Sequence, residues 1–261
     1  HTRLYFNRLP RTHEIERPVA YGTPGTLNSQ ASANIGPTYA ELFHDPPVPP
    51  AGTPTTISTT PSDPDGIRSL ELFYSVEGRA FSSIDMTRGA SGAYVAQIPG
   101  QAAGSVVQFY VLATDNLGAT ASFPAGGPDS RALYEVQDGR ASGNALRNLR
   151  LIMTPGDDAW MHTNINVMSN DRLGSTVIYD EREIYYDTGV RLKSSQRGRL
   201  NPRRVGFNIA FNEDQLLRGI HRTVAVDRSQ GQAPGQRELL FNIMMTSAGG
   251  ISGKYNDLIR I

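Results

Sequence analysis

The sequence predicts a mainly β protein, in which an antiparallel β-sandwich is followed by an α+β region. One observation is the supply of turn formers, 26 Gly and 17 Pro among 261 residues, which favours short elements joined by many turns. A second is that short runs of β-branched and aromatic residues between 38 and 137 are separated by turn clusters. A third is that no window there keeps apolar residues at helical spacing.

The composition of the chain argues against two classes of partner, nucleic acids and membranes. The chain has 25 basic and 25 acidic residues, and nucleic-acid binding proteins usually carry a basic excess, so no nucleic-acid partner is expected. No apolar run approaches the roughly 20 residues that span a bilayer, so no membrane span is expected. The chain has no Cys, so the fold must depend on its hydrophobic core. Because eukaryotic secreted β-sandwiches often carry disulfides, their absence favours a bacterial source.

The N-terminal residues 1–37 are predicted to form an extended lead-in. They are rich in Pro, Gly, Asn and Ser, and they sustain neither the period of a strand nor that of a helix.

The first predicted domain, residues 38–137, contains about seven strands in some 100 residues. The turn Ser62–Gly66 places Pro and Gly where a tight turn needs them, and Asp115–Gly118 is predicted to be a hairpin turn. The run at 106–114, VVQFYVLAT, is the most apolar and is predicted to be central. The expected strands are 53–60, 67–76, 81–86, 93–98, 106–114, 119–123 and 132–136. This count and spacing are typical of an immunoglobulin-like or fibronectin type III-like sandwich.

A polar linker, residues 138–148, is predicted to lead into an α+β region at 149–261. Thr154 is expected to cap a helix whose body is 160–168, with Pro155 in the first turn and Asp157 and Asp158 at the positive helix end. Trp160, the single Trp, is expected to anchor the core. A second helix is expected at 235–248, and strands at 149–153, 175–179, 183–192, 203–211, 220–226 and 254–261.

Three stretches carry a resemblance to known families. The run GVRLKSSQRGRLNPRRVGFNIAF at 189–211 and the later GQRELLFNIMM at 235–245 resemble the CotH family, the spore-coat-protein-H-like atypical kinases. The stretch TPGTLNS at 23–29 resembles the C-terminal edge of bacterial lamin-tail domains. Bacterial secreted proteins of the CotH type often combine lamin-tail, Ig-like and CotH regions in this order.

The CotH resemblance implies that 149–261 is similar to a kinase-like N-lobe. It implies nucleotide contacts at Arg191 and Lys193, with Glu238 able to form the helix-to-strand ion pair of kinases. The carboxylates of such kinases lie in a C-terminal lobe, so this region is expected to be incomplete and the chain to be only the N-terminal part of such a protein. No catalytic residue is assigned, and ATP with Mg²⁺ is expected only if the full-length protein is a kinase.

Two further groups of residues suggest binding chemistry. Asp63, Asp65 and Asp115 sit at predicted turns near one end of the sandwich, where they either bind calcium or serve only as turn formers. A basic run next to Arg191 and Lys193 either contacts an anion or is a solvated loop; its remaining members are Arg197, Arg199, Arg203 and Arg204. Apart from calcium, no cofactor is expected.

The sequence thus favours a bacterial extracellular or cell-surface protein with a structural or interaction role. Its expected partner is a protein or a component of the cell envelope, and the sequence gives no oligomeric state. The alternatives are a CotH-like kinase fragment and a carbohydrate-binding β-sandwich, the latter disfavoured because the aromatic residues are expected to be interior.

Overall fold

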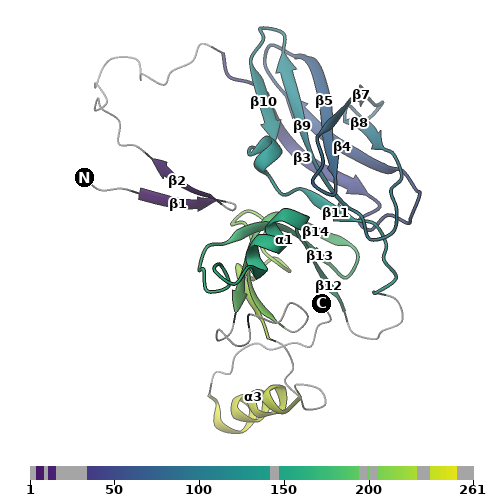
Figure 1. The fold of residues 1–261 in the computed structure, drawn as a ribbon. Helices are drawn as coiled ribbons and strands as arrows, with labels where there is room; N and C mark the ends of the chain where they lie inside the picture. Colours follow the sequence, from purple (N-terminus) through teal and green to yellow (C-terminus); the bar gives the residue numbers. More distant parts are fainter. Residues whose placement is uncertain are drawn as a thin grey trace, which may run out of the picture.

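A computed structural model describes residues 34–141, 147–193, 199, 205–227 and 236–251, together with the backbone of 4–8 and 11–15. The chain is mainly β, and its strands pair antiparallel in four sheets (Figure 1). Within the described ranges, the helices α1 (Pro155–His162) and α3 (Gln236–Gly249) follow the sandwich.

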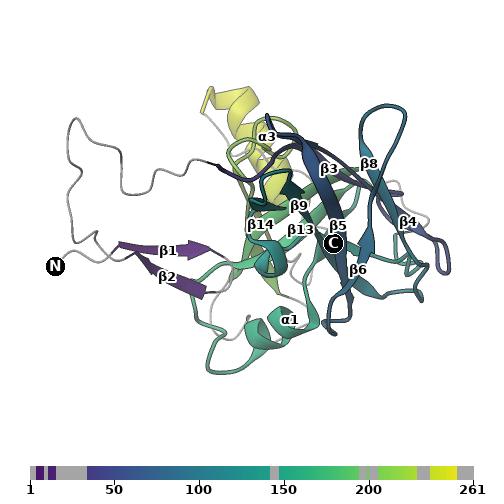
Figure 2. The same ribbon diagram turned by 90° about the horizontal axis from the view of Figure 1, so that it is seen from above.

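Two facing sheets build the sandwich, and Figure 2 shows their strands from above. One sheet has the order β3-β4-β8-β7, with the bounds Thr38–Asp45, Thr55–Ser62, Tyr94–Ile98 and Thr87–Arg88. The other has the order β10-β9-β5-β6, and β11 also pairs with β9. Its strands are Thr120–Phe123, Val106–Asp115, Ile67–Val76, Ser82–Asp85 and Leu133–Glu135.

The alternation of side chains creates the sandwich core. Along β4 every second residue from Thr55 to Thr59 is buried, and along β9 Val107, Phe109, Val111 and Ala113 are fully enclosed. Successive strand residues point to opposite faces, so these positions meet between the two sheets. The predicted β-sandwich is therefore confirmed.

The second half contains a five-stranded antiparallel meander and α1. The sheet order is β12-β13-β14-β15-β16, with the bounds Leu149–Ile152, Leu173–Tyr179, Glu183–Lys193, Gly206–Ala210 and Thr223–Val226. The Thr154 hydroxyl accepts a hydrogen bond from the Asp157 amide at 3.2 Å, so the predicted helix cap is confirmed. Met161 and Val167 pack with Leu173 and Val190 on one face of the sheet.

A β-bulge interrupts the pairing of β13 with β14. Ser175 pairs with Thr188 but Val177 pairs with Tyr185, so β14 carries one extra residue around Tyr186 and Asp187. Asp187 takes a φ of +50°. A bulge re-aims the side chains next to it, and here it directs Tyr186 toward the sandwich core.

Several expectations are corrected. The lead-in was expected to be extended throughout, but it contains a hairpin of β1 (Leu4–Arg8) and β2 (Arg11–Ile15). Strand β3 of the sandwich was not predicted. The first helix ends at His162, earlier than expected. Trp160 is 37% exposed, because the inward positions of α1 are Asp157 and Met161. The expected strand at 254–261 lies outside the described residues.

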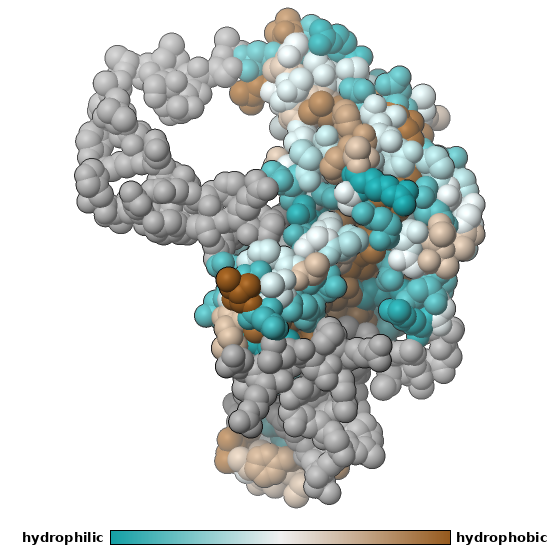
Figure 3. Space-filling view, in the orientation of Figure 1, coloured by the Kyte–Doolittle hydropathy of each residue, from teal (hydrophilic) through white to brown (hydrophobic). Residues whose placement is uncertain are grey.

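The helix α3 confirms the prediction for 235–248. It stands apart from the five-stranded sheet in Figure 1, and its apolar side chains show brown and tan at the lower end of Figure 3. Leu240, Phe241, Ile243 and Met244 are all more than half exposed. Among the described helices, none has the length and apolar character needed to cross a membrane.

Candidate functional site

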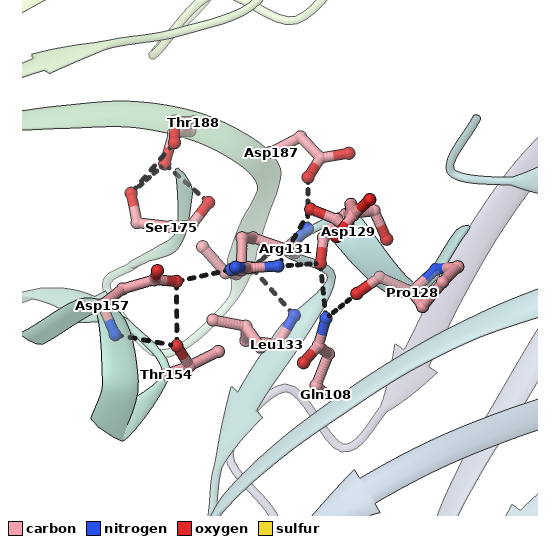
Figure 4. A network of polar contacts seen from close by, with 12 residues as sticks. Gln108, Pro128, Asp129, Arg131, Leu133, Thr154, Asp157, Ser175, Asp187 and Thr188 are labelled. Carbon is pink, nitrogen blue, oxygen red and sulfur yellow. Dashed lines mark hydrogen bonds and ion pairs between the residues drawn. The ribbon is translucent and has the colours of Figure 1, made fainter. Parts of the chain in front are cut away.

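The most extensive polar structure lies where the sandwich meets the second half. Arg131, which precedes β11, donates from Nε to Asp157 Oδ2 of α1 at 2.6 Å, and this carboxylate also accepts from the Thr154 hydroxyl at 2.8 Å (Figure 4). The exposed fractions of Arg131 and Asp157 are 9% and 7%. Burying a charge is costly unless it is paired and hydrogen-bonded, so this ion pair ties the two halves together.

The main chain around Arg131 also forms hydrogen bonds with the second half. The Thr176 hydroxyl of β13 donates to the Arg131 carbonyl at 2.5 Å and accepts from the Leu133 amide at 2.9 Å. The Arg131 amide donates to the Asp187 carboxylate at the bulge. Strand β11 is thus joined to the second sheet by two buried hydrogen bonds to Thr176 and a part-buried one to Asp187.

Beside this network, His44 of β3 and Tyr186 of β14 form a buried pair. His44 Nε2 lies 2.9 Å from the Pro47 carbonyl, which can only accept, so this nitrogen carries the proton. Nδ1 therefore accepts from the Tyr186 hydroxyl at 2.5 Å. Burial lowers the pKa of His44 to about 4 and raises that of Tyr186 far above its usual value.

Arg150 of β12 forms a second polar group at the interface between the sandwich and the second half. Its guanidinium reaches Glu181 at 2.7 Å, Gln137 at 2.9 Å, Glu135 at 3.1 Å and Asp138 at 3.2 Å. Burial, helped by the neighbouring Asp138, raises the pKa of Glu135 in spite of Arg150.

An apolar cluster between the two halves completes this interface. Leu133 of the sandwich packs with Ile152 and Ile178 of the second sheet, and all three are at most 3% exposed. Residues 138–148 were expected to be a linker, yet Asp138 bonds to Arg150, so the linker begins inside the contact.

The three predicted calcium ligands do come together. One carboxylate oxygen from each of Asp63, Asp65 and Asp115 lies within 4.8 Å of the others. Asp115 is fully buried and accepts from Asn34, Gly118 and Ala119 at 2.8, 2.5 and 2.9 Å. Burial acts to raise the pKa of Asp115, but these hydrogen bonds outweigh it and hold the pKa below its ordinary value.

Turn chemistry accounts for much of this cluster. Asp63 accepts from the Asp65 amide at 2.8 Å, and the Gly66 amide bonds to the Asp63 carbonyl with Gly66 at a φ of +83°. Both interpretations of the three carboxylates therefore stay open, and calcium stays a prediction.

The residues implied by the CotH resemblance are only partly described. Arg191 and Lys193 lie two positions apart on β14 and so share a face. Lys193 Nζ pairs with the Asp227 carboxylate, and Arg191 Nη1 donates to Asn170 at 2.8 Å. Glu238 lies in α3, with its side chain outside the described part of the chain, so a pair with Lys193 stays a prediction.

Of the remaining basic run, Arg199 donates to the Val167 carbonyl at 3.0 Å. Arg197, Arg203 and Arg204 lie outside the described residues. The anion contact expected of this run stays a prediction.

Comparisons with known proteins identify no family for this chain. No protein-family model matches the chain, and no curated protein matches it. Among solved structures, a bromine derivative of BhCBM56 has a TM-score of 0.25 at 15% identity, over 35% of this chain and 88% of that one. An uncharacterized Listeria monocytogenes protein, lmo2446, solved with glucose, magnesium and calcium, has a TM-score of 0.28 at 10% identity, over 74% of this chain and 15% of that one.

Sequence reasoning missed the interface residues Arg131, Arg150, His44 and Asp187. The partners that bring these residues into the interface lie 12 to 142 positions away along the chain, so no local pattern marks them. A buried Arg or His can be recognised only once its neighbours in space are known.

Proposed function

We propose that the chain is a structural or interaction protein in which the Ig-like sandwich holds the α+β region in one fixed orientation. The observation that supports this is the interface itself, where Arg131, Asp157, Thr176 and Leu133 are all at most 9% exposed. A flexible spacer would present a small and wet contact to its neighbour. A contact with a buried ion pair and an apolar cluster favours a single rigid body.

The setting that we propose is the outside of a bacterial cell, with a protein or a cell-envelope component as partner. The order of lamin-tail-like, Ig-like and CotH-like stretches supports this setting. A rigid mount would keep the exposed surfaces of the second half at a defined angle to whatever the sandwich is attached to.

Trp160 makes the proposal testable, because the only Trp of the chain lies in the second half and reports unfolding there. We expect Trp fluorescence and the amide NMR signals of β4 and β9 to lose their native values at one urea concentration. Two separate midpoints would contradict the rigid mount, since independent halves unfold independently.

Carbohydrate binding is the second candidate, because some aromatic rings are less interior than expected. Trp160 is 37% exposed, and Phe73, Tyr110 and Phe81 are half-buried on the outer face of the β5-β9 sheet. Phe73 and Tyr110, however, stack on each other with centroids 4.9 Å apart and planes 5° apart. Each therefore occupies one face of the other, which reduces the ring surface that a sugar needs.

Glycan-array binding that is lost in Trp160→Ala would favour this second candidate over the first. The kinase alternative predicts a rise in Tm with ATP and Mg²⁺ that is lost in Lys193→Met. Silence in both assays leaves the structural role as the function that fits.

A further inference from the structure

Two arginines of the second half, Arg172 and Arg191, lie on one face of the five-stranded sheet, and a third, Arg222, lies near them. Partners in an antiparallel sheet share a face, so the pairings place Gly174, Gly189, Ala210 and Thr223 in one row across four strands. The next row on that face holds Arg191, Asn208 and Ala225. The floor is therefore made of small side chains, with one guanidinium and one amide standing on it.

Arg172 reaches the same place from the segment before β13. Its Cδ and Cβ atoms lie 3.2 and 3.4 Å from where a Cβ of Gly189 would be. Gly189 does not take a positive φ, so this position needs glycine for space and not for its backbone angles. The absence of a side chain at 189 lets Arg172 lie over β14 beside Arg191.

Arg222 lies immediately before β16 and opposite Phe211, whose amide donates to the Arg222 carbonyl at 2.8 Å. Burial lowers the pKa of Arg172, and the charges of Arg191 and Arg222 lower it further. The charges of Arg191 and Arg222 thus both disfavour the charged form of Arg172.

The positive charge of this group is largely unbalanced. Arg222 pairs with Glu213 at 2.6 Å, and among the described residues the side chain of Arg191 bonds to the neutral Asn170 alone. The Nε atom of Arg191 is buried and has no hydrogen-bond partner, and within the described residues no carboxylate pairs with Arg172 or Arg191. A buried donor left unpaired costs free energy, and the like charges add to that cost.

We propose that Arg172 and Arg191 form a binding site for an oxyanion, either a phosphate or a carboxylate group of a ligand, and that the charge of Arg222 adds to the positive field there. Guanidinium groups present planar pairs of N–H donors that match both anions. The small residues of the neighbouring row let a ligand approach the sheet, and the Asn208 amide stands next to Arg191 as a further polar group. The site does not depend on the proposed mounting role of the sandwich.

The test is thermal unfolding of the whole chain in sodium phosphate, in sodium citrate and in sodium chloride at equal ionic strength. Equal ionic strength removes general screening from the comparison. We expect phosphate or citrate to raise the Tm relative to chloride, and titration calorimetry with the same anions to give the Kd. The two arms separate a phosphate site from a carboxylate site.

Variants locate the effect. Arg172→Gln and Arg191→Gln should each weaken anion binding at least tenfold, whereas Arg68→Gln, an exposed arginine of β5 in the sandwich, should bind as the parent does. In chloride, Arg191→Gln should unfold no earlier than the parent, because it relieves like-charge repulsion. A parent with equal Tm in all three salts, or an anion effect that survives both substitutions, would overturn the proposal.

A second variant keeps every charge. Gly189→Ala places a Cβ 3.2 Å from Arg172 Cδ, so it should displace Arg172 and weaken anion binding while the chain stays folded. If Gly189→Ala binds the anion as tightly as the parent, Arg172 does not contact it, and the proposed arrangement is wrong.

Discussion

The stability of the interface depends on the protonation state of one buried side chain, His44. His44 donates from Nε2 to a carbonyl and accepts at Nδ1 from the Tyr186 hydroxyl. It also lies among the rings of Phe109, Tyr134 and Tyr186, with centroids between 5.2 and 5.7 Å away. Protonation would add a charge in an apolar place and would put a donor where an acceptor is needed.

We therefore predict that His44 makes the fold sensitive to mild acid. The pKa of His44 is 6.5 in an unfolded chain and about 4 in the fold, so the unfolded state binds more protons between these values. Stability is then full above pH 6.5 and falls as the pH drops toward 4, by about 3 kcal/mol from this residue. The check is the free energy of unfolding from pH 4 to 8.

The matched variant is His44→Gln, which can still donate to a carbonyl and accept from a hydroxyl. Its loss of stability between pH 6.5 and 4 should be smaller than that of the parent. An equal slope in both proteins would show that His44 is not the group that titrates.

The acidic cluster allows turn chemistry and metal binding to be separated residue by residue. Asp115→Ala leaves the donors of Asn34, Gly118 and Ala119 without their acceptor, which should cost roughly 1–3 kcal/mol with or without calcium. Asp65 is exposed, so Asp65→Ala should change stability by less than about 0.5 kcal/mol when calcium is chelated.

The measurement is the Tm of the parent and both variants in calcium and in EDTA. A calcium-dependent rise in the parent that disappears in Asp65→Ala would establish the metal site. Identical curves in calcium and EDTA would leave only the turn role.

At the scale of elements, the sequence predicts most strands but not the β-bulges and register shifts in their pairing. The runs 67–76 and 106–114 match β5 and β9 nearly residue for residue, because their apolar positions alternate and turns bound them. Strand β3 was missed because its pairing slips between Tyr39 and Leu42, which breaks the alternation.

The candidate sites divide in the same way. Turn residues placed Asp63, Asp65 and Asp115 at one end of the sandwich, and the structure brings them together. Arg172 was not foreseen, since only the pairing of β13 with β14 brings it beside Arg191. Sequence patterns report the period of an element, whereas such clusters depend on the pairing between elements.

The bulge in β14 yields a prediction at this scale. Asp187 sits at a φ of +50° and accepts from the Arg131 amide. Asp and Asn tolerate that conformation better than Ala does. Asp187→Ala should thus cost about 2–3 kcal/mol, the sum of backbone strain and an unpaired buried amide.

The control is Asp187→Asn, which keeps a carbonyl oxygen and tolerates a positive φ, and it should cost less than half as much. The two free energies of unfolding from urea denaturation decide the point. Equal losses would mean that the charge of Asp187, and not its shape, holds the bulge.

On the scale of the whole molecule, the two halves share one interior. Tyr186 of the second sheet packs against the core cluster of the sandwich, and Leu133 of the sandwich packs against the second sheet. The apolar contact joins Leu133, before the expected linker, to Ile152, after it. Arg131 and Arg150, which form the polar bonds, precede Leu133 and Ile152 by two positions each. A disturbance at the interface should therefore reach both halves.

The buried ion pair between Arg131 and Asp157 gives the test. Arg131→Met leaves the Asp157 carboxylate buried with only Thr154 and the start of α1 to stabilise it, and breaking such a pair typically costs 3–5 kcal/mol. We predict a loss of about 3 kcal/mol that appears in Trp160 fluorescence and in the sandwich amides together. Adding Asp157→Leu should restore at least half of the loss, because no charge is then left unpaired. If Arg131→Met lowers the midpoint of the second half alone, the interface does not couple the two halves, and the sandwich is a separate module that happens to lie against its neighbour.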